Sequence, residues 1–224
     1  MNRVENALAR ATETKALRLG DGVLCQTAGL FRDMFAGRRP VIIADRTTYG
    51  IAGGRLQSYF LDAGLNPDTP FIFTDDDLHA EWRFVEMLDD RLASTDAVAV
   101  AVGSGTINDL TKLCSFRNGK RYMTVATAAS MDGYTAFGAS ITYEGAKQTF
   151  SCPAPLAVVA DTRIIASAPS HMTASGYADL LAKVPAGADW ILADALGVEP
   201  LDEFAFSVVQ DGLNDALADP EGAR

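Results

Sequence analysis

The sequence predicts an α/β fold, in which a Rossmann-like parallel-sheet nucleotide-binding domain over residues 1–168 is followed by the start of an all-α domain over residues 169–224. Three observations support this prediction. Short apolar runs alternate with segments of helical periodicity, a glycine-containing turn follows one of these runs, and only helical patterns occur after Pro169. Because parallel strands need crossover helices, the alternation indicates an open sheet covered on both faces.

The alternating part begins with the run Arg39-Pro-Val-Ile-Ile-Ala-Asp45, which has the composition of a buried strand. The segment before Gly20 is expected to be a short amphipathic opening. In chain order the predicted elements are strand 39–45, helix 49–64, strand 70–74, helix 79–93, strand 97–102, a helix from residue 110, strand 122–125 and strand 156–160.

Two further segments depart from this alternation. Residues 138–152 contain two alternating stretches around Glu144-Gly145, which is typical of a hairpin. After Pro169, helices are predicted over residues 173–196, interrupted around Pro185, and over residues 201–217. This helical part, of about 55 residues, is small for an independent core, so the domain is expected to be cut short.

Composition limits the function classes. The chain has 224 residues, 48% hydrophobic residues and a net charge of -10, which argues against a nucleic-acid or anionic-membrane surface. Its cysteines are Cys25, Cys114 and Cys152; an odd number without a CxxC pattern predicts reduced thiols and a cytoplasmic protein. The N-terminus lacks the apolar centre of a signal peptide, and no stretch has membrane-spanning length.

Residues 103–109 read Gly-Ser-Gly-Thr-Ile-Asn-Asp between a predicted strand and a predicted helix. Glycines permit a tight turn and a close backbone approach, and the free N–H groups of a first helical turn favour an anion. The pattern predicts a phosphate-bearing cofactor. A plain strand-to-helix turn, with Ser104 or Thr106 capping the helix, stays open, because Asp109 replaces the third glycine of the dinucleotide fingerprint.

Three blocks extend this signal: Gly103-Ser-Gly-Thr-Ile-Asn-Asp-Leu-Thr-Lys112, Thr127-Ala-Ala-Ser-Met-Asp-Gly-Tyr134 and Ser175-Gly-Tyr-Ala-Asp-Leu-Leu-Ala-Lys183. In this order and spacing they resemble the sn-glycerol-1-phosphate dehydrogenases, members of the iron-containing alcohol dehydrogenase and dehydroquinate synthase superfamily. The resemblance covers residues 41–190. It implies an N-terminal nucleotide domain, a C-terminal helical domain and a divalent metal in the cleft between them.

The resemblance implies how NAD or NADP would be held. Asp45 would take the adenine ribose, residues 105–109 the pyrophosphate, and residues 127–130 the nicotinamide side. The implied cofactor-binding residues are Asp45, Gly103, Gly105, Thr106, Ile107, Asn108, Asp109, Thr127, Ala128, Ala129 and Ser130. One departure is Ala136, where the family usually offers a serine to the cofactor.

For the reaction itself, the resemblance implies that Asp132 and Asp179 contact the substrate. Asp179 would also be the one carboxylate ligand of a divalent zinc, nickel or iron ion. The family's other two ligands are histidines farther along the helical domain, so metal binding is expected only if that helical segment is supplied. His79 and His171 are interpreted as surface or capping residues.

Simpler interpretations of the same residues stay open. Asp179 and Lys183, four residues apart on a helix, fit an ordinary surface ion pair. Asp132 before a glycine fits a turn, and Asp45 fits a strand end. The acidic triplet Asp75-Asp-Asp77 is interpreted as a solvated helix start.

The predicted function is the metal-dependent, NAD(P)-linked interconversion of glycerone phosphate and sn-glycerol 1-phosphate, and the 224-residue chain alone is expected to be inactive. A glycerol dehydrogenase or a dehydroquinate synthase-like enzyme is an alternative with the same fold. A non-catalytic nucleotide-binding remnant, or a module completed by another chain, is the alternative from another class. Expected partners are the small phosphorylated substrate and either further copies of this chain or a complementing C-terminal chain, with no nucleic acid and no membrane.

Overall fold

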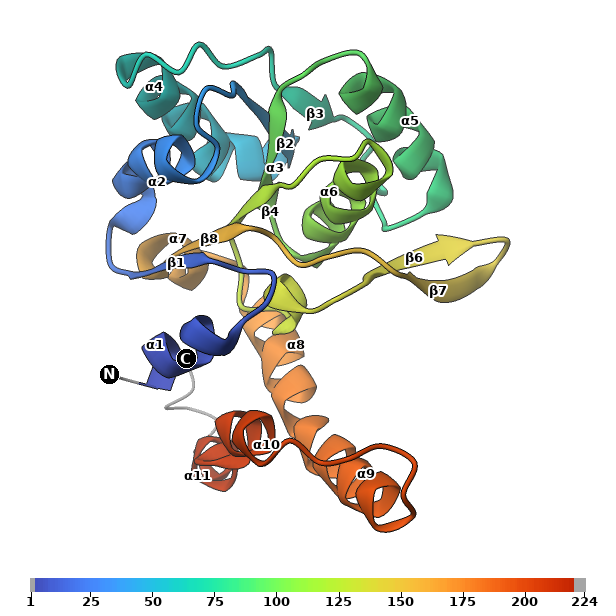
Figure 1. Ribbon diagram of the computed structural model, residues 1–224. Helices are drawn as coiled ribbons and strands as arrows, with labels where there is room; N and C mark the ends of the chain where they lie inside the picture. Colours follow the sequence, from blue (N-terminus) through green and yellow to red (C-terminus); the bar gives the residue numbers. More distant parts are fainter. Residues whose placement is uncertain (1–2, 220–224) are drawn as a thin grey trace.

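The computed structural model describes residues 3–219, so residues 1–2 and 220–224 of the two predicted domains lie outside the described part. Its centre is a six-stranded parallel sheet in the order β1-β8-β5-β4-β2-β3 (Figure 1). The strands are β1 (Ala16–Gly20), β2 (Pro40–Asp45), β3 (Phe71–Phe73), β4 (Val98–Gly103), β5 (Met123–Ala126) and β8 (Ala157–Asp161). The predicted parallel α/β architecture is therefore confirmed.

Helices cover both faces of this sheet, as predicted (Figure 1). Helices α2 (Thr27–Met34) and α4 (Gly54–Asp62) pack on one face, and α5 (Trp82–Ala93) and α6 (Gly105–Arg117) on the other. In β4 the valines face α2 and α4, whereas Ala99 and Ala101 face α5 and α6. Two apolar cores therefore lie on opposite sides of the same strands.

Two element starts differ from the sequence prediction. The helix predicted from residue 49 is preceded by α3 (Arg46–Thr48) and a π-turn (Tyr49–Gly53) that leads into α4. The helix predicted from His79 begins only at Trp82. The reason is tertiary pairing: Thr142 N donates to Ala80 O at 2.7 Å, and Glu81 forms a parallel bridge with Thr142, so this segment stays extended.

The N-terminal strand β1 and helix α2 are absent from the sequence prediction. Helix α1 (Arg3–Arg10) agrees with the expected amphipathic opening, but β1 is an edge strand whose sequence lacks a clear alternation. Ala16 is its one buried residue, and Leu19 is 58% exposed. The connection after it, a 3-10 turn (Val23–Gln26), is held by Asp161, whose carboxylate accepts from Gly22 N at 3.1 Å and Leu24 N at 2.9 Å. The connection after β1 is therefore held by a residue that is distant in the sequence.

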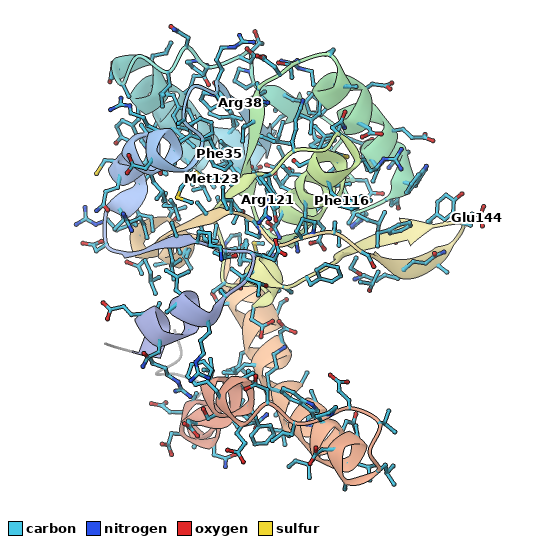
Figure 2. All side chains as sticks on the ribbon, viewed as in Figure 1. Phe35, Arg38, Phe116, Arg121, Met123 and Glu144 are labelled. Atoms are coloured by element: carbon cyan, nitrogen blue, oxygen red, sulfur yellow. The ribbon has the colours of Figure 1, made fainter. Side chains whose placement is uncertain are left out.

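The predicted hairpin is confirmed as β6 (Ala139–Tyr143) and β7 (Ala146–Phe150). Figure 2 shows Glu144 at its tip, away from the sheet. Both Glu144 and Gly145 have positive φ values, 51° and 76°, as such a tight turn requires. The hairpin packs on α5 through aromatic rings: the Trp82 ring lies 4.7 Å from that of Tyr143 and 5.4 Å from that of Phe150.

The remaining helices are α7 (Thr162–Ala166), α8 (Ser170–Leu181), α9 (Lys183–Ala195), α10 (Glu203–Gln210) and α11 (Leu213–Ala218). The predicted interruption near Pro185 falls at Ala182, and Pro185 sits in the first turn of α9, where its missing N–H costs nothing. The predicted helix 201–217 is broken at Gly212, which has a φ of 80°.

Helices α8–α11 project from the sheet as an arm (Figure 1). Gly187 and Leu213 are the residues of these four helices that are buried in the described structure. The predicted domain division at residues 168 and 169 stays a prediction. None of the helices within residues 3–219 combines the length and the apolar character needed to span a lipid bilayer.

Candidate functional site

The glycine turn lies where β4 ends and α6 begins. At Gly103 a Cβ atom would lie 2.5 Å from the Ile107 Cβ, so glycine is required for the first turn of α6 to close over the strand end. The first intrahelical bond runs from Asn108 N to Ser104 O, at 3.0 Å. The N–H groups of residues 105–107 therefore precede the hydrogen-bonded part of the helix.

The first turn of α6 carries no side-chain cap. Ser104 occupies the N-cap position, as one interpretation of the sequence held, but its hydroxyl makes no capping bond. A helix end without a cap has free N–H groups and a positive partial charge, which together suit an anion.

A cavity of about 370 Å³ opens beside this turn. Its lining includes Asp45 and Phe73 at strand ends, Ser104 and Thr127 directly after strands, and Met172 from the arm. Of the predicted cofactor residues, the lining includes Asp45, Thr106, Ile107, Thr127 and Ala128. The cavity thus follows the carboxyl ends of β2, β4 and β5, which is where ligands of open α/β sheets bind.

Asp45 is half-buried at one side of the cavity and caps α3. Its carboxylate accepts from Thr48 N at 2.7 Å, and Thr48 Oγ1 accepts from Asp45 N at 3.2 Å, which completes a capping box. The neighbouring Arg46 forms an exposed ion pair with Asp76 at 3.5 Å. The strand-end interpretation of Asp45 is therefore compatible with a ligand contact through its other oxygen.

The side chains of Asn108 and Asp109 are engaged away from the cavity. Tyr122 OH donates to Asn108 Oδ1 at 3.0 Å, and Ser140 N donates to Asp109 Oδ2 at 3.2 Å. Burial raises the pKa of Asp109 above its usual value, while the ammonium of Lys112 acts in the opposite direction. The backbone N–H groups of both residues belong to the hydrogen-bonded part of α6, so the N–H groups free to meet a phosphate are those of residues 105–107.

The segment 127–130 follows β5 and lies against the turn. Thr127 N donates to Gly103 O at 3.2 Å, and Tyr134 OH donates to Ala128 O at 2.8 Å. Burial raises the pKa of the Tyr134 hydroxyl, so this group stays a neutral donor. Sequence reasoning assigned no role to Tyr134, which ties the loop after residue 130 back to the cavity wall.

Helix α8 crosses this loop at Gly176. A Cβ there would lie 1.8 Å from Ala129 O, so the contact is between backbones. The signal in the sequence was a glycine inside a helical pattern, which indicates close packing when it is not a cap. Gly176 brings the arm to the cavity.

We expect Gly176→Ala to lower the free energy of unfolding by about 1–3 kcal/mol, because α8 must move off Ala129. Gly29→Ala is the matched control: Gly29 is also helical, and no atom lies within 4 Å of its added Cβ. That substitution should stabilise the protein by about 0.5–1 kcal/mol. Urea denaturation followed by circular dichroism measures both; equal effects would contradict the close contact.

Asp132 and Asp179 are brought together, although they lie far apart in the sequence. Asp132 N donates to Asp179 Oδ2 at 2.9 Å, and Lys183 Nζ lies 2.9 Å from Asp132 Oδ2 and 3.8 Å from Asp179 Oδ1. The Asp132 N–H and the Lys183 ammonium hold the pKa of Asp179 below its usual value. The predicted ion pair of Asp179 with Lys183 is therefore present, but as part of a cluster that also includes Asp132.

This cluster does not by itself fit a divalent metal. Residues 3–219 contain no group of three or more His, Cys, Asp or Glu side chains able to hold an ion. His79 pairs instead with Asp77, at 3.0 Å, on the surface. A metal centre at Asp179 needs ligands from outside the described residues, since catalytic sites of this kind use about three protein ligands.

A parallel sheet with a cavity and an uncapped helix at the carboxyl ends of its strands defines a Rossmann-like α/β protein. Residues 18–169 match the family described as iron-containing alcohol dehydrogenase. The chain belongs to this family.

Curated relatives bear the name glycerol-1-phosphate dehydrogenase (NAD(P)+). The relative from Bacillus velezensis is 36% identical over 178 residues, which cover 78% of this chain and 45% of the relative. The relative from Methanosarcina mazei is 35% identical over 188 residues, which cover 84% of this chain and 51% of the relative. The resemblance inferred from the three sequence blocks is confirmed, and the chain spans about half the length of the curated relatives it matches.

The fold has solved counterparts. The structure of a protein described as a probable glycerol dehydrogenase from Sinorhizobium meliloti 1021 aligns with a TM-score of 0.75 and 19% identity. The alignment covers 94% of this chain and 57% of that one. At this identity the likeness establishes the fold alone.

Proposed function

We propose that this chain provides the cofactor-binding part of a metal-dependent, NAD(P)-linked enzyme that interconverts glycerone phosphate and sn-glycerol 1-phosphate. The observation that carries the proposal is the uncapped first turn of α6 beside a cavity of about 370 Å³ at the strand ends. The names of the curated relatives support the choice of cofactor and substrates.

The residues present fit a dinucleotide. In this proposal the N–H groups of residues 105–107 bind the pyrophosphate, and Asp45 accepts from the adenine ribose at the far side of the cavity. Segment 127–130 then borders the nicotinamide. When bound, the cofactor supplies or accepts the hydride, while the chain orients it.

Just after segment 127–130, Asp132 together with Asp179 of α8 forms the proposed substrate side. Lys183 offsets one of the two negative charges of this acidic pair, and the pair lies where the arm meets the loop after β5. In the proposal Asp179 is the one metal ligand from this chain. Zinc, nickel and iron remain the candidate ions, and the further ligands come from outside residues 3–219.

A second candidate is a non-catalytic nucleotide-binding module completed by another chain. It is favoured because residues 3–219 contain no group of three metal-binding side chains. In this candidate the arm binds a helical partner or further copies of the chain, because its exposed apolar side chains could pack against them. These side chains are Leu181, Ile191, Leu192, Leu196 and Val198. The cytoplasm stays the proposed compartment, supported by three free thiols.

Titration calorimetry of the 224-residue chain with NAD, NADH and NADP tests the proposed cofactor site. We expect measurable binding of NAD and NADH, with NADP weaker by roughly tenfold because Asp45 repels a 2′-phosphate. Asp45→Asn should narrow this difference without loss of the fold, since asparagine is an equally good N-cap.

No binding of any of these cofactors at millimolar concentration would overturn the proposed function. NADP binding as tight as NAD, and unchanged in Asp45→Asn, would show that Asp45 does not read the ribose.

A further inference from the structure

Lys112 is a buried cation on α6 that the proposed cofactor contacts do not use. Its side chain is 1% exposed, and its Nζ donates to Ala136 O and Gly138 O, both at 2.9 Å. Asp109 Oδ1 lies 3.6 Å from the same nitrogen. Burying an ammonium is costly, and an apolar side chain could fill the same space, so packing alone does not explain a lysine here.

The two acceptors belong to the loop between β5 and β6, which contacts the arm through Asp132. At its start, Met131 lies over Gly105, where an added Cβ would be 3.5 Å from it. Next comes Asp132, which contacts Asp179 on α8. The loop therefore borders the glycine turn on one side and the acidic cluster on the other.

The loop is fastened at separate points. Near its start, Tyr134 OH reaches back to Ala128 O. Near its end, Gly138 N donates to Cys152 O at 2.8 Å at the base of the hairpin. At the same end, Lys112 of α6 donates to two loop carbonyls. Asp109, one turn earlier in α6, accepts from Ser140 N in β6. One turn of α6 thus holds both the loop end and the hairpin.

We propose that Lys112 is a positioning residue: it fixes residues 131–138, and with them Asp132, against the helix whose first turn would bind the cofactor phosphates. Asp109 completes the arrangement by balancing the buried charge. The assignment to cofactor geometry rests on the proposed function, whereas the fixing of the loop is a property of this chain alone.

The test compares Lys112→Met with Lys120→Met. Methionine keeps a long unbranched stem and removes the ammonium. Lys120 is the matched control, because its Nζ also donates to two backbone carbonyls, Leu92 O and Thr95 O, but on a connection remote from the loop. Hydrogen exchange of peptides covering residues 131–138 and the affinity for NADH are measured at a temperature where both variants are folded.

We expect Lys112→Met to speed exchange of the Asp132, Ala136 and Gly138 amides by about tenfold and to weaken NADH binding by roughly fivefold. Lys120→Met should change neither. A general loss of stability would speed exchange throughout the folded chain, so faster exchange confined to residues 131–138 reports positioning. Unchanged exchange in folded Lys112→Met would overturn the proposal.

Two outcomes separate this proposal from the proposed function. Faster loop exchange in a protein whose wild type binds no NADH supports the loop fixing and contradicts the cofactor site. NADH binding that is equal in wild type and Lys112→Met, despite faster exchange, overturns the positioning role. If Lys112→Met does not fold, Lys112→Gln, which keeps a donor for one carbonyl, replaces it with an intermediate effect expected.

Discussion

Gly105→Val is expected to abolish measurable NADH binding while leaving the protein folded. An added Cβ at this position meets only the Met131 side chain, at 3.5 Å, which is an ordinary contact. The branched side chain would nevertheless occupy the space in which a phosphate approaches the first-turn N–H groups of α6. The expected loss of affinity is at least about 100-fold, or roughly 2.7 kcal/mol.

Calorimetry measures the affinity, and circular dichroism confirms the fold. Gly103→Val is the informative contrast, because a Cβ there would clash with Ile107 at 2.5 Å and should destabilise the protein by about 1–3 kcal/mol or more. Loss of binding in Gly103→Val would therefore reflect a displaced helix. Wild-type affinity in Gly105→Val would show that no phosphate lies at this turn.

The second large effect concerns catalysis. The 224-residue chain alone is expected to show no NADH-dependent reduction of glycerone phosphate, whichever of zinc, nickel or iron is added. Within residues 3–219 no three metal-binding side chains gather, and the ammonium of Lys183 already faces both Asp132 and Asp179. A lone carboxylate cannot hold an ion and position a ketone for hydride transfer.

Adding a helical polypeptide equivalent to the rest of the curated relatives should restore metal binding and turnover together. Asp179→Ala should then remove both, whereas Asp194→Ala, also in the arm but outside the cluster, should remove neither. Metal content by mass spectrometry and NADH oxidation are the two readouts. Zinc-dependent turnover by the purified 224-residue chain would contradict the ligand count.

The sequence predicted the central strands and helices because their residues are buried in simple periodic patterns. Ile42 and Val100 in neighbouring strands are fully buried, and such positions leave a clear apolar run. Strand β1 was not predicted because its own residues show no strand pattern. It forms by pairing with β8, with Ala16 opposite Ala157. The predicted helix start at His79 was wrong for a similar reason, since pairing with Thr142 holds residues 80 and 81 extended.

The candidate site likewise has features that local sequence predicts and features that it does not. The glycine turn and the strand-end residue Asp45 could be found from local sequence, because each belongs to a short motif. Close packing at Gly176 has a local signal, but its partner Ala129 and the burial of Lys112 could not be predicted, because both depend on how distant segments meet. The cofactor and substrate roles of the predicted residues remain predictions that the titrations address.

The strand order also prescribes when each part of the sheet can assemble during synthesis. Strands β2, β3 and β4 find hydrogen-bonding partners soon after they emerge, since β2 pairs with both β3 and β4. In the described sheet β1 pairs with β8, so Leu17 must wait for Val158 before it has a partner. Pairings so distant in sequence are slow to form. A ribosome-bound chain thus carries an unpaired β1 until the sheet is nearly finished, and its arginine at position 18 discourages pairing with other chains meanwhile.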